Sequence, residues 1–157
     1  MKDSIKTGFG FGLTSGIITT LGLIIGLYSS TNSAIAVIGG IITIAVADAL
    51  SDALGIHISE ESKKAGKKEI WEATLSTFVS KLFFALTFIV PVLLLDLHSA
   101  IIASIIWGIL LLGVFSYFIA KNKKENAFKV IAEHLIIAFG VIIITYYLGL
   151  WISATFV

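Results

Sequence analysis

Residues 99–120, SAIIASIIWGILLLGVFSYFIA, contain no charged side chain and indicate the class of the protein. An α-helix rises about 1.5 Å per residue, so about 20 apolar residues cross the roughly 30 Å hydrocarbon core of a bilayer. Backbone groups in lipid must be hydrogen-bonded within their own segment, unless the chain forms a closed barrel. Because the strand alternation of a barrel is absent, we predict a transmembrane helix here.

Four more segments are long and apolar enough for the same role. The chain has 157 residues, of which 57% are hydrophobic and 13% charged, whereas soluble domains carry about a quarter charged residues. We therefore predict an all-α polytopic membrane protein, a single membrane domain over residues 1–157 whose main partner is the lipid bilayer. Its five predicted helices cover residues 8–28, 34–58, 73–95, 98–120 and 129–151.

The lysines predict the orientation of the chain. All 11 basic residues are lysines, and all but one lie outside the five apolar segments or at their edges, on alternate connections. They are Lys2, Lys6, Lys63, Lys64, Lys67, Lys68, Lys121, Lys123, Lys124 and Lys129, with Lys81 as the exception. The positive-inside rule then places the N-terminus in the cytoplasm and the C-terminus outside, as an odd number of crossings requires. A signal peptide in place of the first helix is the alternative, although no A-x-A site follows it.

Several classes of function find no support in the sequence. A net charge of +1 makes no basic field for nucleic acid, and zero cysteines exclude disulfides, Fe–S clusters and thiolate zinc sites. No phosphate-binding glycine loop, nucleophile elbow or HExxH motif occurs. We therefore expect neither an enzyme nor a bound cofactor. An intramembrane enzyme is a remote alternative.

Glycines recur every four residues in the first helix, at Gly8, Gly12 and Gly16. Such spacing makes a groove in which another helix can approach closely. That helix could belong to the same chain or to a second copy. No internal repeat is evident, so we expect any symmetry to come from a homodimer through this helix.

Two carboxylates stand four residues apart in the second helix. Asp48 and Asp52 therefore share one helical face, which Ser51 and Gly55 flank. A carboxylate inside a membrane is costly unless it is paired, protonated or hydrated, and hard divalent cations prefer such oxygen ligands. The pair predicts a cation site, with a wetted helix end as the alternative.

The remaining polar residues allow two interpretations each. Lys81 could extend to the interface or act as a counter-ion for Asp48 or Asp52. Glu133 and His134 could lie at the interface or form a polar cavity lining. His57, at the end of the second helix, and His98, in an outer loop, are more typical of polar residues at the interface than of ligands. Pro91 should kink the third helix.

Residues 60–72 are the only sizeable segment outside the apolar runs. We expect a short cytoplasmic linker that extends the second or third helix. Its Glu60 and Glu61 are candidate accessory groups for a cation.

Several stretches resemble the vacuolar iron transporter family. GLTSGIITTLGL, at residues 12–23, is similar to the family's first-helix signature, and ADALSDALGIHIS, at residues 47–59, to its second-helix motif. Pro91 and the TYYLG stretch at residues 145–149 fit as well. The resemblance implies a homodimer with a metal path between the subunits, and proton-coupled export of Fe²⁺ or Mn²⁺ from the cytoplasm.

The chain departs from the family pattern at the metal ligands. This chain has Ser15 where the family motif has its first-helix aspartate. It has Asp52 in place of the second-helix methionine and Asp48 in place of a motif glycine. Two further glutamates of the family motif are replaced by Ile44 and Ile56. In place of the family's glutamate-rich cytoplasmic helices, this chain has only the short linker. Exchange of a soft thioether for an oxygen anion favours harder ions such as Mn²⁺, Mg²⁺ or Ca²⁺.

These observations predict a transporter of divalent cations in a plasma or vacuole-type membrane, with protons competing for the aspartates. The metal site would comprise Asp48, Asp52, Ser15, Thr19 and Ser51. The alternative is a membrane protein of the same fold that has lost metal transport and serves as a carrier of another solute or as an assembly partner. In that case Lys81 would neutralise an aspartate.

Overall fold

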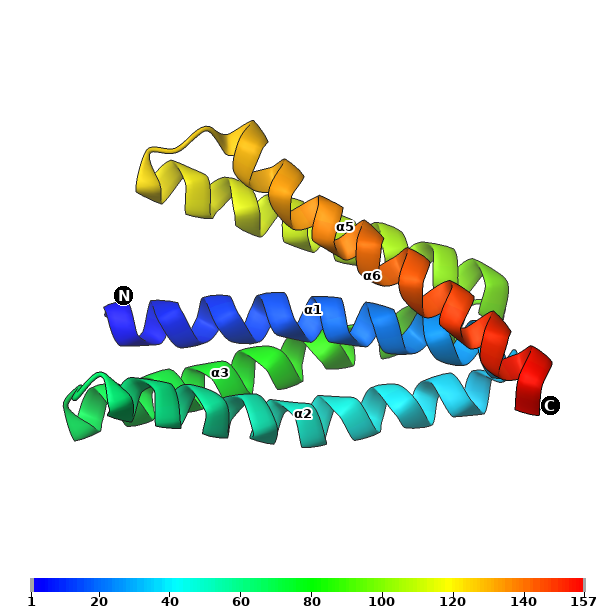
Figure 1. The fold of residues 1–157 in the computed structure, drawn as a ribbon, viewed down its shortest axis with the longest axis horizontal. Coiled ribbons are helices and arrows are strands. Elements are labelled where there is room, and N and C mark those ends of the chain that lie inside the picture. The colour runs from blue at the N-terminus through cyan, green and yellow to red at the C-terminus, as the bar shows by residue number, and fades with distance from the viewer. Residues whose placement is uncertain (1, 157) are drawn as a thin grey trace. The chain divides into compact units, whose positions relative to one another are not determined.

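A computed structural model describes residues 2–156, which form helices and short turns without a strand (Figure 1). The elements are α1 (Asp3–Thr31), α2 (Ala34–Ser62), α3 (Lys67–Thr87), α4 (Ile89–Leu94), α5 (Leu97–Lys123) and α6 (Ala127–Phe156). Five helical segments are long and apolar enough to cross a membrane, with α3 and α4 counted together. The predictions of an all-helical chain and of five membrane-length helices are confirmed.

The helices extend beyond the apolar segments that predicted them. α2 continues to Ser62 and α3 begins at Lys67, so residues 60–62 and 67–72 extend the two helices, as expected of this linker, and only residues 63–66 connect them. The reason is physical: the apolar length reports the membrane-embedded part of a helix, whereas its backbone hydrogen bonds continue into water. The same applies to α1, which spans residues 3–31 instead of 8–28.

Three helices are followed by a residue in the left-handed conformation. These residues are Asn32 after α1, Lys64 after α2 and Lys124 after α5, with φ angles of 46°, 58° and 56°. Asparagine tolerates this region, whereas lysine adopts it at a steric cost. Each of these residues lies in a short turn between two helices.

Side-chain caps begin α5 and α6. The carboxylate of Asp96 accepts a hydrogen bond from the backbone N–H of Ser99 at 3.0 Å. The side-chain oxygen of Asn126 accepts one from the backbone N–H of Phe128, also at 3.0 Å. Both bonds satisfy donors that the first turn of a helix leaves free. The bond from Ser99 lowers the pKa of Asp96, because it stabilises the charged form.

Pro91 explains the interruption between α3 and α4. Proline has no N–H to donate to the carbonyl four residues earlier, which here belongs to Thr87, the last residue of α3. Phe88 forms the C-cap and α4 resumes at Ile89. The predicted kink at Pro91 thus appears as a break of one residue.

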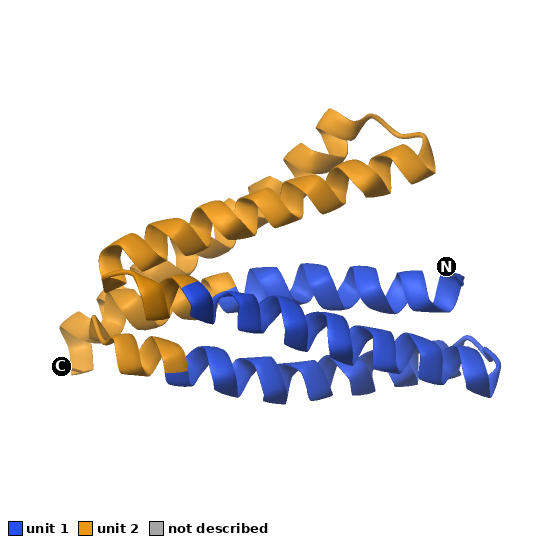
Figure 2. Cartoon of the chain, turned by 180° about the vertical axis from the view of Figure 1, so that it is seen from behind, with its two compact units in different colours: residues 1–20, 39–90 blue, residues 21–38, 91–157 orange. Residues whose placement is uncertain are grey.

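The chain divides into two compact units, drawn in blue and orange in Figure 2. Unit 1 comprises residues 1–20 and 39–90, and unit 2 comprises residues 21–38 and 91–157. Unit 1 therefore holds the first part of α1, most of α2 and all of α3. Unit 2 holds the end of α1, the start of α2, and α5 and α6.

In unit 1, the glycines of α1 pack against α3 of the same chain. A Cβ atom at Gly12 would collide with the carbonyl oxygen of Thr77, and one at Gly16 would lie 3.1 Å from that of Lys81. Gly8 faces Ala73 in the same way, with its carbonyl carbon at 3.0 Å. Of the two roles left open for this glycine face, the structure has packing within the chain. A second copy would need another surface.

Unit 2 uses close approaches of the same kind. A Cβ atom at Gly149 of α6 would lie 2.6 Å from the carbonyl oxygen of Gly26 in α1, and one at Gly22 would lie 2.9 Å from Cγ1 of Val141. Leu21 fills the space over Gly108 of α5. Small residues thus let α1 approach both long helices of this unit.

Candidate cation site in unit 1

Lys81 of α3 is the largest fully buried side chain of the described residues, with a relative exposure of 1%. Burial of an ammonium group is costly unless it is paired and hydrogen-bonded. Its Nζ atom donates a hydrogen bond to Oγ of Ser15 in α1 at 2.9 Å and a very short one to Oδ2 of Asp52 in α2. Three helices thus meet at one cation.

Asp48 completes the cluster with a different kind of contact. Its Oδ2 atom lies 2.5 Å from Nζ of Lys81, which makes an ion pair. Among the described residues, the same buried oxygen has no hydrogen-bond partner. The short distance between Nζ of Lys81 and Oδ2 of Asp48 still gives a strong attraction, because Coulomb energy depends on the separation of two charges and not on an angle. Oδ2 of Asp48 therefore contacts Lys81 through an ion pair and not through a hydrogen bond.

The cluster lies in the middle of its helices. Asp48 is 14 residues from either end of α2, and Lys81 is at least 13 residues from either end of the segment Lys67–Leu94. At the helical rise, 14 residues correspond to about 21 Å. This location favours an interior site over a wetted helix end. The side chains of Asp48 and Asp52 keep exposures of 27% and 19%, so the aspartates are only partly enclosed by their own chain.

The structure brings together some of the predicted metal-site residues and separates others. Ser15, Asp48 and Asp52 surround Lys81. Thr19 lies one turn along α1, and its hydroxyl donates to the carbonyl of Ser15 at 2.8 Å. Ser51 is exposed on α2, outside the cluster. Two roles were open for Lys81, extension to the interface or pairing with an aspartate. In the structure it forms ion pairs with both Asp48 and Asp52.

Two carboxylates from one chain do not make a complete metal site. Within residues 2–156, no group of three or more His, Asp or Glu side chains could hold a metal ion. The cluster sets two carboxyl groups against one amino group. Nζ of Lys81 therefore occupies the position in which the two carboxyl groups would bind a cation. Further ligands for a divalent ion would have to come from hydroxyls, from water or from a second copy of the chain.

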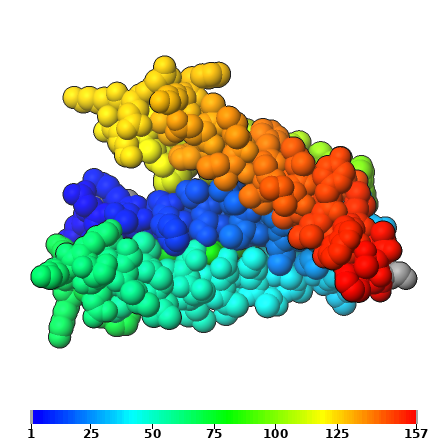
Figure 3. All heavy atoms as spheres, viewed as in Figure 1, coloured from blue at the N-terminus to red at the C-terminus, as the bar shows by residue number. Residues whose placement is uncertain are grey.

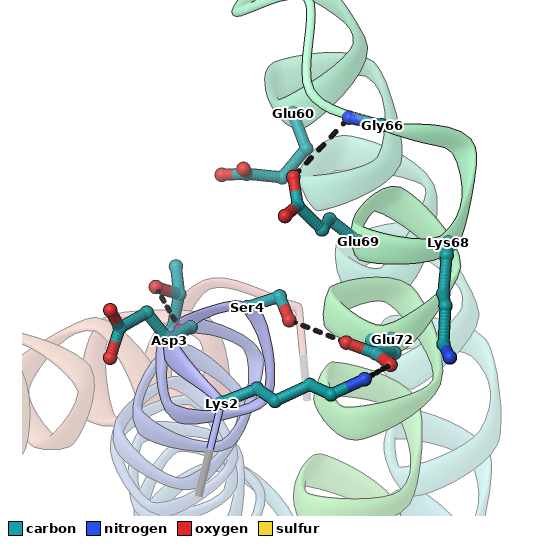
Figure 4. Close-up of a pocket in the computed structure, with 9 residues that line it drawn as sticks. Lys2, Asp3, Ser4, Glu60, Gly66, Lys68, Glu69 and Glu72 are labelled. Carbon is teal, nitrogen blue, oxygen red and sulfur yellow. Dashed lines mark hydrogen bonds and ion pairs between the residues drawn. The ribbon is translucent and has the colours of Figure 1, made fainter.

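Glu60 lies in a separate cleft of unit 1, where the N-terminal residues meet the α2–α3 turn (Figure 4). The cleft has a volume of about 610 Å³, and its charged lining residues are Lys2, Asp3, Glu60, Lys68, Glu69 and Glu72. Nζ of Lys2 and Oγ of Ser4 donate to Glu72 at 2.6 and 2.8 Å. The bond to Glu72 raises the pKa of Lys2. Glu60 pairs with Lys63 at 2.7 Å, and Glu61 is exposed.

The predicted polar lining at Glu133 and His134 has two different environments. Glu133 is exposed, whereas Nδ1 of His134 lies 2.7 Å from Oγ of the buried Ser116 in α5. The Ser116 hydroxyl already donates its proton to the carbonyl of Leu112, so Nδ1 of His134 must be the donor.

The other two histidines also have local partners. Nδ1 of His57 lies 3.0 Å from Oγ1 of Thr74. The His57 ring also packs against the ring of Trp71, with the two ring centroids 5.0 Å apart. His98 lies 2.9 Å from the hydroxyl of Tyr28. These contacts hold helix ends together in unit 1 and unit 2 respectively.

Sequence reasoning did not find the cleft of Figure 4. Its ion pair between Lys2 and Glu72 joins residues 70 positions apart. No local spacing signals such a contact, because periodicity identifies a face of one helix and not its partner.

No protein-family model and no curated protein sequence matches the chain.

Proposed function

We propose that the protein is a multi-pass membrane transporter of divalent metal cations, which exchange with protons at the cluster of Asp48, Asp52 and Ser15. The buried charges support this proposal. Ionisable groups in the middle of membrane-length helices are expensive and commonly mark ion pathways. The resemblance to the vacuolar iron transporters supplies the substrate class, Fe²⁺ or Mn²⁺, and export from the cytoplasm as the direction.

The charge of the cluster supports exchange as the mechanism. Two carboxylates facing one ammonium leave one negative charge in excess. A metal ion or a proton can compensate that charge, so the two compete for the same oxygens. Because Nζ of Lys81 contacts both carboxylates, an incoming cation must also displace Lys81.

The lysine distribution supports a cytoplasmic N-terminus and an external C-terminus. Lys2 contacts Glu72 of α3, so the N-terminal lysines and those of the α2–α3 turn lie at the same end of unit 1. Tyr28 contacts His98, so two connections without lysine lie together in unit 2. Glu60 and Glu61 would then attract cations near the cytoplasmic entrance.

We also propose that two copies associate through the side of α2 that the other helices of unit 1 leave exposed. Small, exposed residues recur there every four positions: Gly39, Thr43, Ala47, Ser51 and Gly55. Residues of this size let helices approach closely in a membrane. Ala47 and Ser51 precede Asp48 and Asp52, whose carboxylates are partly exposed. A second copy on this face would cover the carboxylates and supply further oxygen ligands from its own aspartates.

A cross-linking experiment tests the dimer. The chain has no cysteine, so Ala47→Cys should form a disulfide between copies in membranes upon mild oxidation. Val79→Cys is the matched control, because Val79 is exposed on α3 and not on the helix that carries the proposed face. Equal cross-linking of the two variants would contradict the interface.

Flux measurements in proteoliposomes test transport. Wild-type protein should carry Mn²⁺ inward or outward with opposite proton movement, and Asp52→Asn should abolish the flux while the protein stays folded. Glu125→Gln, at the exposed α5–α6 turn, is a control that should keep full flux. Undiminished flux through Asp52→Asn would exclude the assigned site.

Loss of transport is the alternative function, and the position of Lys81 favours it. Nζ already fills the cation position, and the described residues of one chain contain no set of three metal-binding side chains. The protein would then carry another solute or act as an assembly partner in the membrane. Calorimetric titration at neutral pH separates the two functions: absence of binding for Mn²⁺ and other divalent ions supports the alternative.

A further inference from the structure

The turn between α5 and α6 carries an uncompensated positive charge. Residues 121–129 include Lys121, Lys123, Lys124 and Lys129 against one carboxylate, Glu125, which gives a net charge of +3. All five side chains are exposed, and the structure shows no ion pair to any of them within residues 2–156. The next carboxylate, Glu133, is one turn further along α6 and is exposed as well.

The lysine-rich end of unit 1 is different. In unit 1, the N-terminal residues and the α2–α3 turn carry six lysines and five carboxylates. Three of those lysines are paired: Lys2 with Glu72, Lys6 with Asp3 and Lys63 with Glu60. That end is nearly neutral, so the surplus charge of the α5–α6 turn is a local property and not a general feature of the connections.

An exposed aromatic residue accompanies these lysines. Phe128, in the first turn of α6, is 81% exposed, which is among the highest values for a large apolar side chain here. In Figure 3 the surface of this turn, drawn in yellow, carries side chains that project away from the helices. Lysines together with an exposed aromatic ring are typical of a surface that meets lipid headgroups.

We propose that the α5–α6 turn binds the headgroups of anionic phospholipids. The turn connects two membrane-length helices, Leu97–Lys123 and Ala127–Phe156, so it lies at the depth of the headgroups. Four ammonium groups supply donors for lipid phosphates, and Phe128 inserts among the upper acyl carbons. The backbone donors at the start of α6 take no part, because Asn126 already accepts from Phe128 and Lys129.

The binding is electrostatic and therefore responds to lipid charge and to salt. Each lysine near an anionic surface contributes several-fold to affinity, so the four together should prefer an anionic lipid over a zwitterionic one. Raising the salt concentration to about 0.5 M should weaken the preference, because screening then acts within a few Å. Neither effect depends on cation transport.

Native mass spectrometry of the full chain in detergent tests this proposal. The probes are phosphatidylglycerol and phosphatidylcholine with identical acyl chains, and lipid adducts are counted for each. One variant replaces Lys121, Lys123, Lys124 and Lys129 by Gln, and a matched variant replaces Lys63, Lys64, Lys67 and Lys68 by Gln. All eight side chains are exposed, so both variants should fold.

The expected result is a clear preference of the wild type for phosphatidylglycerol, which the first variant loses by about tenfold or more and the matched variant keeps. Equal binding of both lipids by the wild type overturns the proposal. So does an unchanged preference in the first variant, or an equal loss in both variants, since either result places the lipid elsewhere.

Discussion

Nζ of Lys81 lies 2.5 Å from Oδ2 of Asp48, which joins the middle of α3 to the middle of α2 by an ion pair with a fully buried cation. Ser15 and Asp52 supply its hydrogen bonds. The cluster therefore has two possible consequences, for stability and for cation binding. The first can be measured even if the protein carries no metal.

Lys81→Met should destabilise the protein by about 3–5 kcal/mol, because removal of one partner leaves buried charge uncompensated. Adding Asp48→Asn and Asp52→Asn to this variant should restore part of the stability, since no net charge then remains in the cluster. Unfolding in detergent, followed by circular dichroism, measures both. A triple variant as unstable as the single one would show that packing, and not charge, dominates at Lys81.

Gly12→Ala should weaken the contact between α1 and α3. The new Cβ would collide with the carbonyl oxygen of Thr77, which is backbone and cannot move aside, so we expect a loss of about 1–3 kcal/mol. Gly113→Ala in α5 is the control, because nothing lies within 4 Å of its added Cβ. That change should be neutral or slightly stabilising, since alanine favours a helix. Similar unfolding temperatures for the two variants would contradict the packing.

Ser116→Ala and Ser104→Ala should have different effects although both side chains are fully buried in α5. Ser116 accepts a hydrogen bond from His134, and such bonds between membrane helices are worth about 0.6 kcal/mol on average. Among the described residues, the hydroxyl of Ser104 has no hydrogen-bond partner, so its removal should cost nothing or stabilise. A double-mutant cycle with His134→Ala measures the coupling, which should vanish for Ser104.

The cap at Asp96 predicts a pH dependence. Because the hydrogen bond from Ser99 lowers the pKa of Asp96 in the folded state, the charged cap stabilises α5 above the unfolded pKa, about 3.9. That contribution is lost as the pH falls through the folded value. Asp96→Ala should therefore lower the unfolding temperature at neutral pH, and the difference from wild type should shrink in acid.

Asp96→Asn is the matched variant for this cap. Its amide oxygen can accept the bond from Ser99 without a charge, so its unfolding temperature should lie between those of wild type and Asp96→Ala. It should also lack the pH-dependent part of the effect. An acid-independent difference between wild type and Asp96→Ala would contradict a role for the charged form.

The sequence alone was sufficient for the number and type of the helices. Each apolar segment is as long as a bilayer is thick, and in lipid only a helix satisfies its own backbone. The break before Pro91 followed from the missing N–H of proline. The sequence also indicated that residues 60–72 extend the second or third helix, but it did not locate the turn at residues 63–66. Polar residues at a helix end are equally compatible with helix and turn.

The tertiary structure alone decided which helices meet. The four-residue spacing of Gly8, Gly12 and Gly16 identified a packing face but not its partner, which proved to be α3 of the same chain. The spacing of Asp48 and Asp52 put both on one side of α2 but left Lys81 with two possible roles. Periodicity within a helix determines what shares a face, whereas the contact of Lys81 with both aspartates depends on how three helices pack, which no single segment encodes.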